Sequence, residues 1–163
     1  MDTYNGHFMQ TFLPYESYEQ SAKVLDDKRL GKQRSECVII LKTLLGVYSK
    51  ESRRGWPHHP ATKMWCGYEL SLTNYAEAIC AEWIRRGHAD TCMAWFLGRR
   101  KELLLPRVIP VDASCPSWLG NEDFHRSHRS NLLRKSDYYK QFWPNERDDL
   151  PYVWPEARGK NAS

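Results

Sequence analysis

Apolar side chains recur at steps of three and four residues along most of the chain, which is the spacing of amphipathic α-helices. Ser17 is followed by Gln20 three residues later, which predicts a helix start, and no proline interrupts the chain before Gly46. We therefore expect a long helix in two halves over residues 18–45. Its second half is apolar on nearly every side, which predicts a position in the centre of the molecule. The shared apolar face carries Leu30, Cys37, Leu41 and Leu44.

The rest of the pattern also predicts helices. A helix over 61–86 has Pro60 at its first turn and Gly87 just after its end, as helix termini commonly do. Shorter helices are expected over 91–104, 121–135 and 137–142. The prolines within 148–155 disfavour a helix there and predict an extended strap over the core. No segment alternates as a strand does, so the predicted fold class is all-α, a compact single-domain helical bundle with a proline-rich C-terminal strap.

The length of 163 residues suits one domain. We interpret 1–8 as an N-terminal extension, 9–155 as the helical domain and 156–163 as a disordered tail. No stretch of about 18 uncharged apolar residues is present, and the first residues lack the basic start and apolar run of a secretion signal. The five cysteines include no closely spaced pair, which argues against a zinc finger and for a reducing compartment. We expect a cytoplasmic monomer without membrane contact, metal or cofactor.

The positive charge of the chain is concentrated in one segment. The net charge of +4 comes from 24 basic and 20 acidic side chains. Residues 124–135, FHRSHRSNLLRK, contain four of the basic side chains and no acidic one, so the rest of the chain is neutral. A concentrated basic face is typical of a phosphate binder and predicts DNA, double-stranded, as the partner. A solvated helix face without a partner is the alternative.

One side of the first long helix carries Lys28, Lys32 and Glu36 at steps of four residues, with Arg29 beside them as a candidate DNA contact. Two interpretations fit this spacing. An exposed Lys–Glu pair would stabilise the helix by roughly a few tenths of a kcal/mol. In the other, Glu36 beside a phosphate-bearing ligand serves as a general acid or base, or stabilises a developing cation.

The start of the helix over 121–135 gathers two histidines and two arginines, namely His125, Arg126, His128 and Arg129. Amide donors at a helix N-terminus and arginine side chains both suit a phosphate, so we interpret these four residues as DNA contacts. A metal site shared with His58 and His59 is the alternative, although no Cys or carboxylate partner stands at ligand spacing.

The loop over 46–60 is basic and contains a tryptophan that has no helix face to bury it. Trp56 is therefore the candidate for stacking on bases or for wedging into an opened DNA site. The other candidate DNA contacts of this loop are Arg53, Arg54, His58 and His59.

Five motifs lie between Met9 and Pro155: FLP at 12–14, LGKQR at 30–34 with Glu36, HPATKMW at 59–65 with GYE at 67–69, FHRSHRSNLLRK, and DDLPYVWP at 148–155. Together they resemble a group of small bacterial and phage proteins in the pyrimidine-dimer DNA glycosylase, or endonuclease V-like, family.

This resemblance implies a compact all-α fold that bends DNA, flips out a damaged or modified pyrimidine, and combines DNA glycosylase with abasic-site lyase activity. In that family an amine attacks C1′ of the nucleotide, a helix-borne glutamate assists, and arginines hold phosphates. Glu36 matches the catalytic carboxylate and Arg34 the phosphate-binding arginine, with Ser35 between them. Because extra residues precede Met9, Lys28 or Lys32 is expected to supply the amine.

Alternatives stay open at this point. The protein could hydrolyse the glycosidic bond without covalent attachment, or have lost the reaction and act as a nucleic-acid-binding module. An enzyme that installs or edits a hypermodified base in phage DNA is a third possibility, and it would need a small co-substrate.

Overall fold

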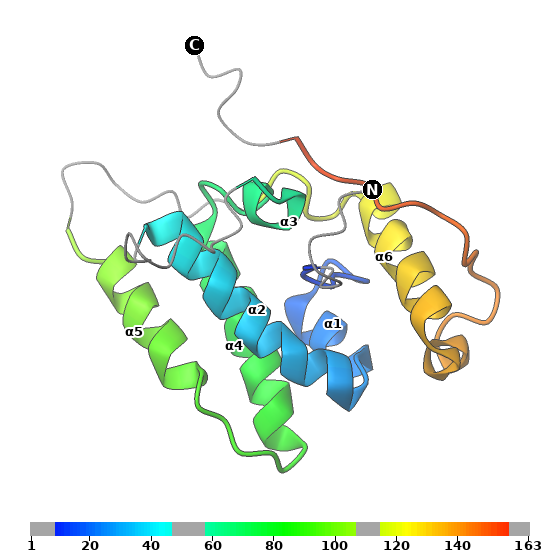
Figure 1. The fold of residues 1–163 in the computed structure, drawn as a ribbon, viewed down its shortest axis with the longest axis horizontal. Coiled ribbons are helices and arrows are strands. Elements are labelled where there is room, and N and C mark those ends of the chain that lie inside the picture. Colours follow the sequence, from blue (N-terminus) through cyan, green and yellow to red (C-terminus); the bar gives the residue numbers. More distant parts are fainter. Residues whose placement is uncertain (1–8, 47–57, 107–114, 157–163) are drawn as a thin grey trace.

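The computed structural model describes residues 9–46, 58–106 and 115–156. Within these ranges the chain forms α-helices and one 3-10 helix and no β-strand, which confirms the predicted all-α class (Figure 1). Three of the predicted DNA contacts, Arg53, Arg54 and Trp56, lie outside the described residues, as do the extension over 1–8 and most of the predicted tail. The elements are α1 Tyr18–Val24, α2 Asp27–Leu45, α3 Pro60–Lys63, α4 Glu69–Arg85, α5 Met93–Leu103, α6 Glu122–Lys135 and the 3-10 helix η1 Asp137–Gln141.

The single helix predicted over 18–45 is wrong, because the chain forms two helices, α1 and α2, that are separated at Leu25 and Asp26. The Ser17 side chain accepts a hydrogen bond from the Gln20 amide and starts α1. The helix stops after Val24, where Leu25 and Asp26 adopt extended backbone angles before α2 begins. The Asp26 amide donates to the Tyr139 hydroxyl at 3.2 Å, so a residue of η1 helps to fix the break between the two helices.

The single helix predicted over 61–86 is wrong, because α3 ends at Lys63 and α4 begins only at Glu69. Gly67 has a φ of +83°, a left-handed conformation that only glycine adopts readily. The Glu69 carboxylate accepts from the Gly67 amide at 3.1 Å and stabilises this turn. The side chain of Trp65 is fully buried, and its indole N–H donates to Thr11 at 3.0 Å.

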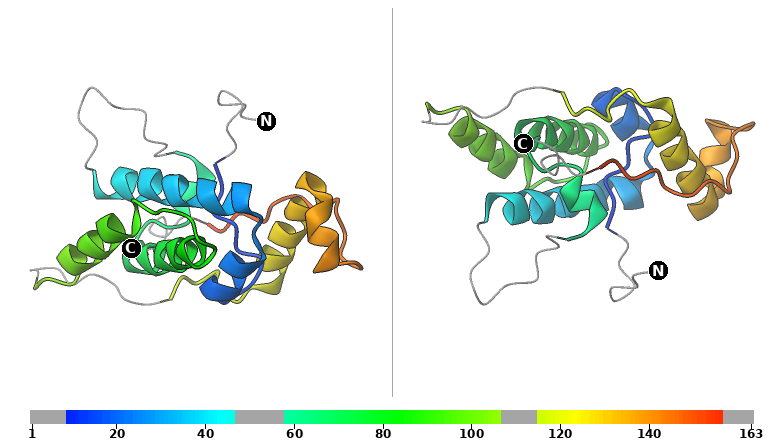
Figure 2. Two further views of the ribbon diagram at one scale, coloured as in Figure 1. Left: turned by 90° about the horizontal axis from the view of Figure 1, so that it is seen from below. Right: turned by 90° about the horizontal axis from the view of Figure 1, so that it is seen from above.

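The helices pack in two layers. α2 lies over α4, and α4 also contacts α1 and α5, while α6 and η1 stand together at one end of the molecule (Figure 2). The core between α2 and α4 contains side chains that are completely inaccessible to solvent, such as Leu30, Leu41, Leu72 and Ile79. In the part of the chain that the structure describes, no helix is both long enough and apolar enough to cross a bilayer.

Two extended segments connect α6 to the rest of the protein. Residues 9–14 are buried, and their backbone is bonded to side chains of both α2 and α6. The predicted strap runs along α6, where Ser130 accepts from the Leu150 amide at 3.0 Å and Ser127 from the Val153 amide at 3.1 Å. The candidate site lies where residues 9–14 pass between α2 and α6.

Candidate active site between α2 and α6

The side of residues 9–14 that faces α2 is bonded by two polar side chains. Gln33 accepts from the Phe12 amide at 3.0 Å and donates to the Gln10 carbonyl at 2.8 Å. Glu36 accepts from the Gln10 amide through Oε2 at 3.0 Å. Buried backbone groups outside regular secondary structure need such partners, because an unpaired group would lose its bonds to water without replacement. One oxygen of Glu36 is therefore used to hold the backbone.

On the opposite side, two histidines of α6 bind the backbone N–H and carbonyl of one residue of the same segment. His128 Nδ1 accepts from the Leu13 amide at 2.9 Å, and His125 Nδ1 donates to the Leu13 carbonyl at 2.8 Å. His125 Nε2 accepts in turn from the Gly120 amide at 2.9 Å. Each ring accepts an N–H through one nitrogen, so both imidazoles are neutral in this arrangement.

Burial agrees with this assignment. His125 is 2% exposed and His128 is fully buried. Burial lowers the pKa of His125, and it lowers the pKa of His128 to about 3. The expectation that these histidines contact phosphate is corrected here, because the α6 face that carries them points to the core and to residues 9–14.

Glu36 is a buried carboxylate at the edge of the solvent. The residue is 7% exposed, and its Oε1 lies 3.4 Å from Nζ of Lys32, whose side chain is 48% exposed. Burial raises the pKa of Glu36, although the Gln10 amide and the Lys32 ammonium act in the opposite direction. A carboxyl group with a raised pKa exchanges protons nearer to neutral pH than an exposed one. The second oxygen of Glu36 is thus paired with the ammonium group of an exposed lysine.

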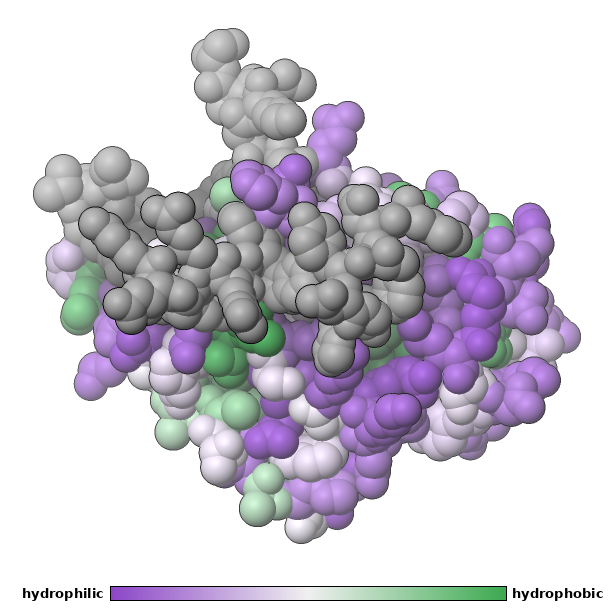
Figure 3. Space-filling model, viewed as in Figure 1, coloured by the Kyte–Doolittle hydropathy of each residue, from purple (hydrophilic) through white to green (hydrophobic). Residues whose placement is uncertain are grey.

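Four cations from α2 and α6 gather near this carboxylate, and we call them the α2–α6 cation cluster: Arg29, Lys32, Arg134 and Lys135. The Arg29 guanidinium donates to the Lys135 carbonyl at 3.5 Å and joins the end of α6 to the start of α2. Arg134 donates to the carbonyls of Asp148 at 2.5 Å and Leu150 at 2.7 Å and so holds the strap. Hydrophilic residues cover much of the right side of the molecule, where α6 lies (Figure 3).

The charges of the cluster act on Lys135. Partial desolvation and the neighbouring positive charges of Arg29, Lys32 and Arg134 lower the pKa of its amine, and Glu36 partly offsets them. The sequence placed Arg134 and Lys135 in its basic segment but not in the site. They lie near the site because α6 ends against α2. The number of charges in a segment does not reveal such a contact between distant parts of the chain.

The strap adds a tyrosine to the same region. The Tyr152 phenol lies beside the Gln10 side chain and is influenced by the charges of Arg134 and Glu36. Its ring meets His128 edge to face with centroids 5.4 Å apart, and it contacts Trp154 at 5.5 Å. Burial raises the pKa of Tyr152, so its hydroxyl is neutral at physiological pH. Tyr152 therefore joins the strap to α6 and to residues 9–14 beside the site.

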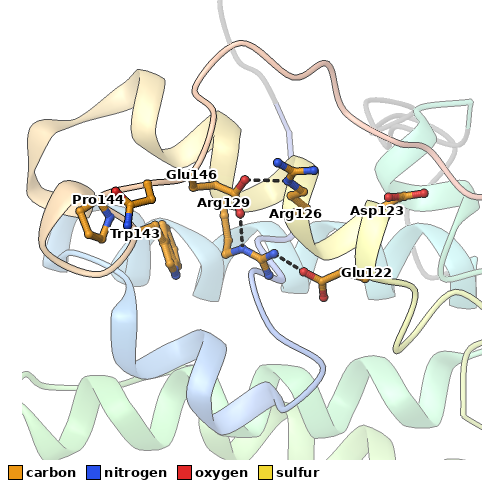
Figure 4. Close-up of a pocket in the computed structure, with 8 residues that line it drawn as sticks. Glu122, Asp123, Arg126, Arg129, Trp143, Pro144 and Glu146 are labelled. Atoms are coloured by element: carbon orange, nitrogen blue, oxygen red, sulfur yellow. Dashed lines mark hydrogen bonds and ion pairs between the residues drawn. The ribbon is translucent and has the colours of Figure 1, made fainter.

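Arg126 and Arg129 line a separate pocket of about 490 Å³ (Figure 4). Glu146 lies between them and accepts from Arg126 at 2.7 Å and from Arg129 at 3.2 Å, while Arg129 also pairs with Glu122. With Asp123, the lining holds three carboxylates and two guanidinium groups. Lys135 follows Arg126 by nine positions, which places their Cα–Cβ directions about 180° apart around α6. The expectation that these arginines meet Glu36 around one hollow is therefore corrected.

The other predicted residues of α2 lie at the edge of the site or outside it. Arg34 donates to Asp90 at 2.7 Å and lies over the Trp83 ring at 5.0 Å, with 13% of its side chain exposed. It thus braces the residues that precede α5, which corrects its expected place beside Glu36. A shift of two residues turns a helical side chain by about 200°, and this is the physical reason. Lys28 is exposed one turn before Lys32.

The histidines do not converge as a metal site would require. His59 Nδ1 accepts from the Ala61 amide at 3.0 Å and caps α3, and its ring meets Trp154 edge to face. His58 is exposed, and the two histidines of α6 are bonded to Leu13. Among the residues that the structure describes, no group of three or more His, Cys, Asp or Glu side chains is arranged to hold a metal ion.

Comparison with known proteins adds one match. Residues 9–95 match a protein family described as pyrimidine dimer DNA glycosylase. The match covers more than half of the 163 residues and includes residues 9–14, α2 and α4. No curated protein and no solved structure matches the chain.

Proposed function

The chain belongs to the pyrimidine dimer DNA glycosylase family, and on this basis we propose that it excises a damaged or modified pyrimidine from double-stranded DNA, with Glu36 as its catalytic carboxylate. We further propose that it works as a cytoplasmic monomer without a cofactor. One observation carries the proposal: Glu36 is buried, has a raised pKa, and lies with its Oε1 3.4 Å from an exposed lysine of a four-cation cluster.

The cation cluster is the proposed DNA contact. Phosphates of a DNA strand that passes the seam between α2 and α6 would meet Arg29, Lys32 and Arg134, and the release of counterions would favour binding. The target base is stacked inside the duplex, so the nucleotide must swing out before Glu36 can act at its C1′. Tyr152 is positioned to contact the sugar or base of such a nucleotide.

The proposed chemistry breaks the bond between C1′ and N1 of the pyrimidine. The electron pair of this bond leaves with the base, and positive charge develops on C1′ and the ring oxygen. The ionised Glu36 would stabilise this charge and afterwards accept a proton from the group that adds to C1′. Abasic-site lyase activity additionally needs an amine beside the carboxylate, and Lys32 meets that distance requirement at 3.4 Å.

We expect Glu36→Gln to reduce the rate of base release by about 100-fold or more, within the usual range for loss of a general acid or base. The amide oxygen of glutamine can still accept from the Gln10 amide, so the fold should be kept. The measurement is single-turnover release from a duplex oligonucleotide that carries one cyclobutane pyrimidine dimer. The control is Glu19→Gln, which changes an exposed carboxylate on α1.

A DNA-binding protein without catalysis is the second candidate, because one oxygen of Glu36 already has a structural role at Gln10. In that case the wild-type protein binds the lesion-bearing duplex but releases no base from it. This second candidate is favoured if the wild-type protein binds irradiated and abasic DNA but acts on neither.

A further inference from the structure

Two aromatic rings are exposed just beyond the end of α6, outside the candidate site. Of the exposed large apolar side chains in the described part of the chain, Tyr138 and Phe142 are the two aromatic ones, 39% and 37% exposed. We propose that these two rings, which we call the outer aromatic pair, stack on the bases of unpaired nucleotides in DNA. This inference rests on the proposed function, because it names the state of the DNA that the protein recognises.

The backbone around the outer aromatic pair is held in one conformation. Tyr138 belongs to η1, drawn in orange in Figure 1, and Phe142 follows as its C-cap, so that the two rings meet edge to face with centroids 5.6 Å apart. The Ser136 hydroxyl accepts from the Tyr138 amide at 3.2 Å, and the Gln141 side chain donates to the Tyr138 carbonyl at 2.8 Å. A base that stacks here would therefore not have to order the backbone, which lowers the cost of binding.

A second pair of rings, Tyr139 and Trp143, supports the outer aromatic pair from the protein interior. Both are buried, and they stack with centroids 5.7 Å apart and an interplanar angle of 7°. Tyr138 contacts Tyr139 at 5.1 Å, and Phe142 contacts Trp143 at 6.0 Å. The Trp143 indole N–H donates to the Tyr15 hydroxyl at 2.9 Å. Each exposed ring is thus packed on a buried ring.

The outer aromatic pair lies next to the α2–α6 cation cluster. The Tyr139 hydroxyl donates to the Asp26 carboxylate, which also pairs with Arg29 at 3.2 Å. The Arg29 guanidinium lies over the Tyr139 ring at 5.9 Å, and Lys135 precedes Tyr138 by three positions. Proteins that bind single DNA strands combine these two features, because cations follow the backbone while aromatic rings stack on the bases.

The surface of the outer aromatic pair suits a base better than a phosphate. The two charged residues of η1, Asp137 and Lys140, pair with each other at 2.8 Å and add no net charge. Bases inside an intact duplex are stacked on each other and offer no open face. A nucleotide that swings out toward Glu36 leaves its neighbours partly unstacked. Such neighbours are the ligands that we assign to the two rings.

DNA binding by a variant without the two rings tests this inference. Tyr138→Ala and Phe142→Ala are combined in the full-length protein, and fluorescence anisotropy measures binding to single-stranded oligothymidylate and to an unmodified paired duplex. We expect the affinity for the single strand to fall about 10-fold or more, within the range for loss of stacked aromatic rings. The affinity for the paired duplex should change little. The salt slope of single-strand binding should stay the same, because no phosphate contact is removed.

Two control variants and a direct signal accompany this measurement. Tyr138→Phe keeps the ring and should bind the single strand like the wild type. Leu104→Ala removes an exposed apolar side chain at the end of α5 and should do the same. The direct signal comes from 2-aminopurine, a fluorescent adenine analogue whose emission falls when it stacks. Placed within the oligothymidylate, it should be quenched by the wild type and much less by the double variant.

The outcomes separate the inference from the proposed function. Single-strand affinity that is equal in the double variant and the wild type overturns the inference, and a surface for another protein would give this result. An equal loss of affinity for the paired duplex also overturns it. Emission of 2-aminopurine that does not fall on wild-type binding does so even if the double variant fails to fold. The proposed function survives all three results if the wild type releases a base from a dimer, and it fails if the wild type quenches 2-aminopurine but releases no base.

Discussion

At the scale of single residues, the histidines of α6 show how a buried ionisable group is assigned a structural role. Both rings bind the backbone of Leu13: His128 accepts from its N–H, and His125 donates to its carbonyl. Protonation of His128 would remove its acceptor for the Leu13 amide, and protonation of His125 would remove its acceptor for Gly120. The segment that carries Gln10 to Glu36 therefore depends on neutral imidazoles more than 110 residues away in the chain.

This dependence predicts how stability changes with pH. The pKa of His128 falls from 6.5 in an unfolded chain to about 3 in the folded one. The unfolded state therefore binds more protons between these values, so the stabilisation is complete above about pH 6.5 and is lost as the pH falls. We expect His128 to lower the free energy of unfolding by about 1.4 kcal/mol per pH unit below that point.

Urea unfolding at pH 7 and pH 5 measures this effect. His128→Asn serves as the comparison, because Oδ1 of asparagine can accept from the Leu13 amide and does not titrate. The stability difference between wild type and variant should shrink by about 2 kcal/mol from pH 7 to pH 5. If the free energies of unfolding of the two proteins changed equally with pH, His128 would not be held in its neutral form.

At the scale of elements, one side of α2 packs in the core and the other side carries the candidate site. The core side packs on α4, where Gly31 leaves room for the Trp83 side chain of α4. A Cβ at Gly31 would lie 2.9 Å from Cη2 of Trp83. Trp83 is itself held by His88, stacked at 3.9 Å, and by Arg34 above its ring. The other side of α2 carries the polar residues of the site, so the spacing of α2 and α4 also positions Glu36.

A pair of glycine variants tests this contact. A Cβ added at Gly98 of α5 would meet no neighbouring atom within 4 Å, so Gly98→Ala should stabilise the protein by about 1 kcal/mol through helix propensity alone. Gly31→Ala gains the same propensity but must displace Trp83, and strain of this kind costs about 1–3 kcal/mol. We expect a net loss of about 1 kcal/mol in thermal or urea unfolding. Equal stabilisation by both variants would contradict close packing at Gly31.

At the scale of the whole molecule, positive charge is distributed unevenly. The α2–α6 cation cluster has four cations with Asp26 and Glu36 as carboxylate partners. The pocket at the start of α6 has two guanidinium groups and three carboxylates. We therefore expect a phosphate backbone to bind at the end of α6 that lies against α2 and not at the end that carries Arg126.

Salt dependence of DNA binding distinguishes the two regions. Each phosphate contact contributes about 0.9 to the slope of log K against log salt. We expect Lys32→Gln to reduce the slope by about one, because it removes an exposed cation of the cluster. Arg126→Gln should change it little, because Glu146 already neutralises Arg126. Fluorescence anisotropy with one duplex over a range of salt concentrations provides the slopes. A larger change in slope for Arg126→Gln than for Lys32→Gln would place DNA at the other end of α6.

Local pattern is sufficient for much of the fold. The start of α1 at Ser17, the position of α6 and the buried face of α2 follow from helical periodicity and capping, which are properties of neighbouring residues. The boundary between α3 and α4 was missed because the turn at Gly67 depends on burial of Trp65 against Thr11, a residue 54 positions away.

The sequence by itself determined the helical class, and its spacing and family resemblance singled out Glu36 as the residue to examine. Tertiary structure alone decided which charges surround it. Periodicity places a side chain on a face of its own helix, but it does not determine which face meets another element. Here that choice depends on contacts such as Leu13 with His128 and Arg29 with Lys135, which join residues more than 100 positions apart. These contacts join the end of α6 to α2, and they leave Arg126 with Glu146 on the other side of α6.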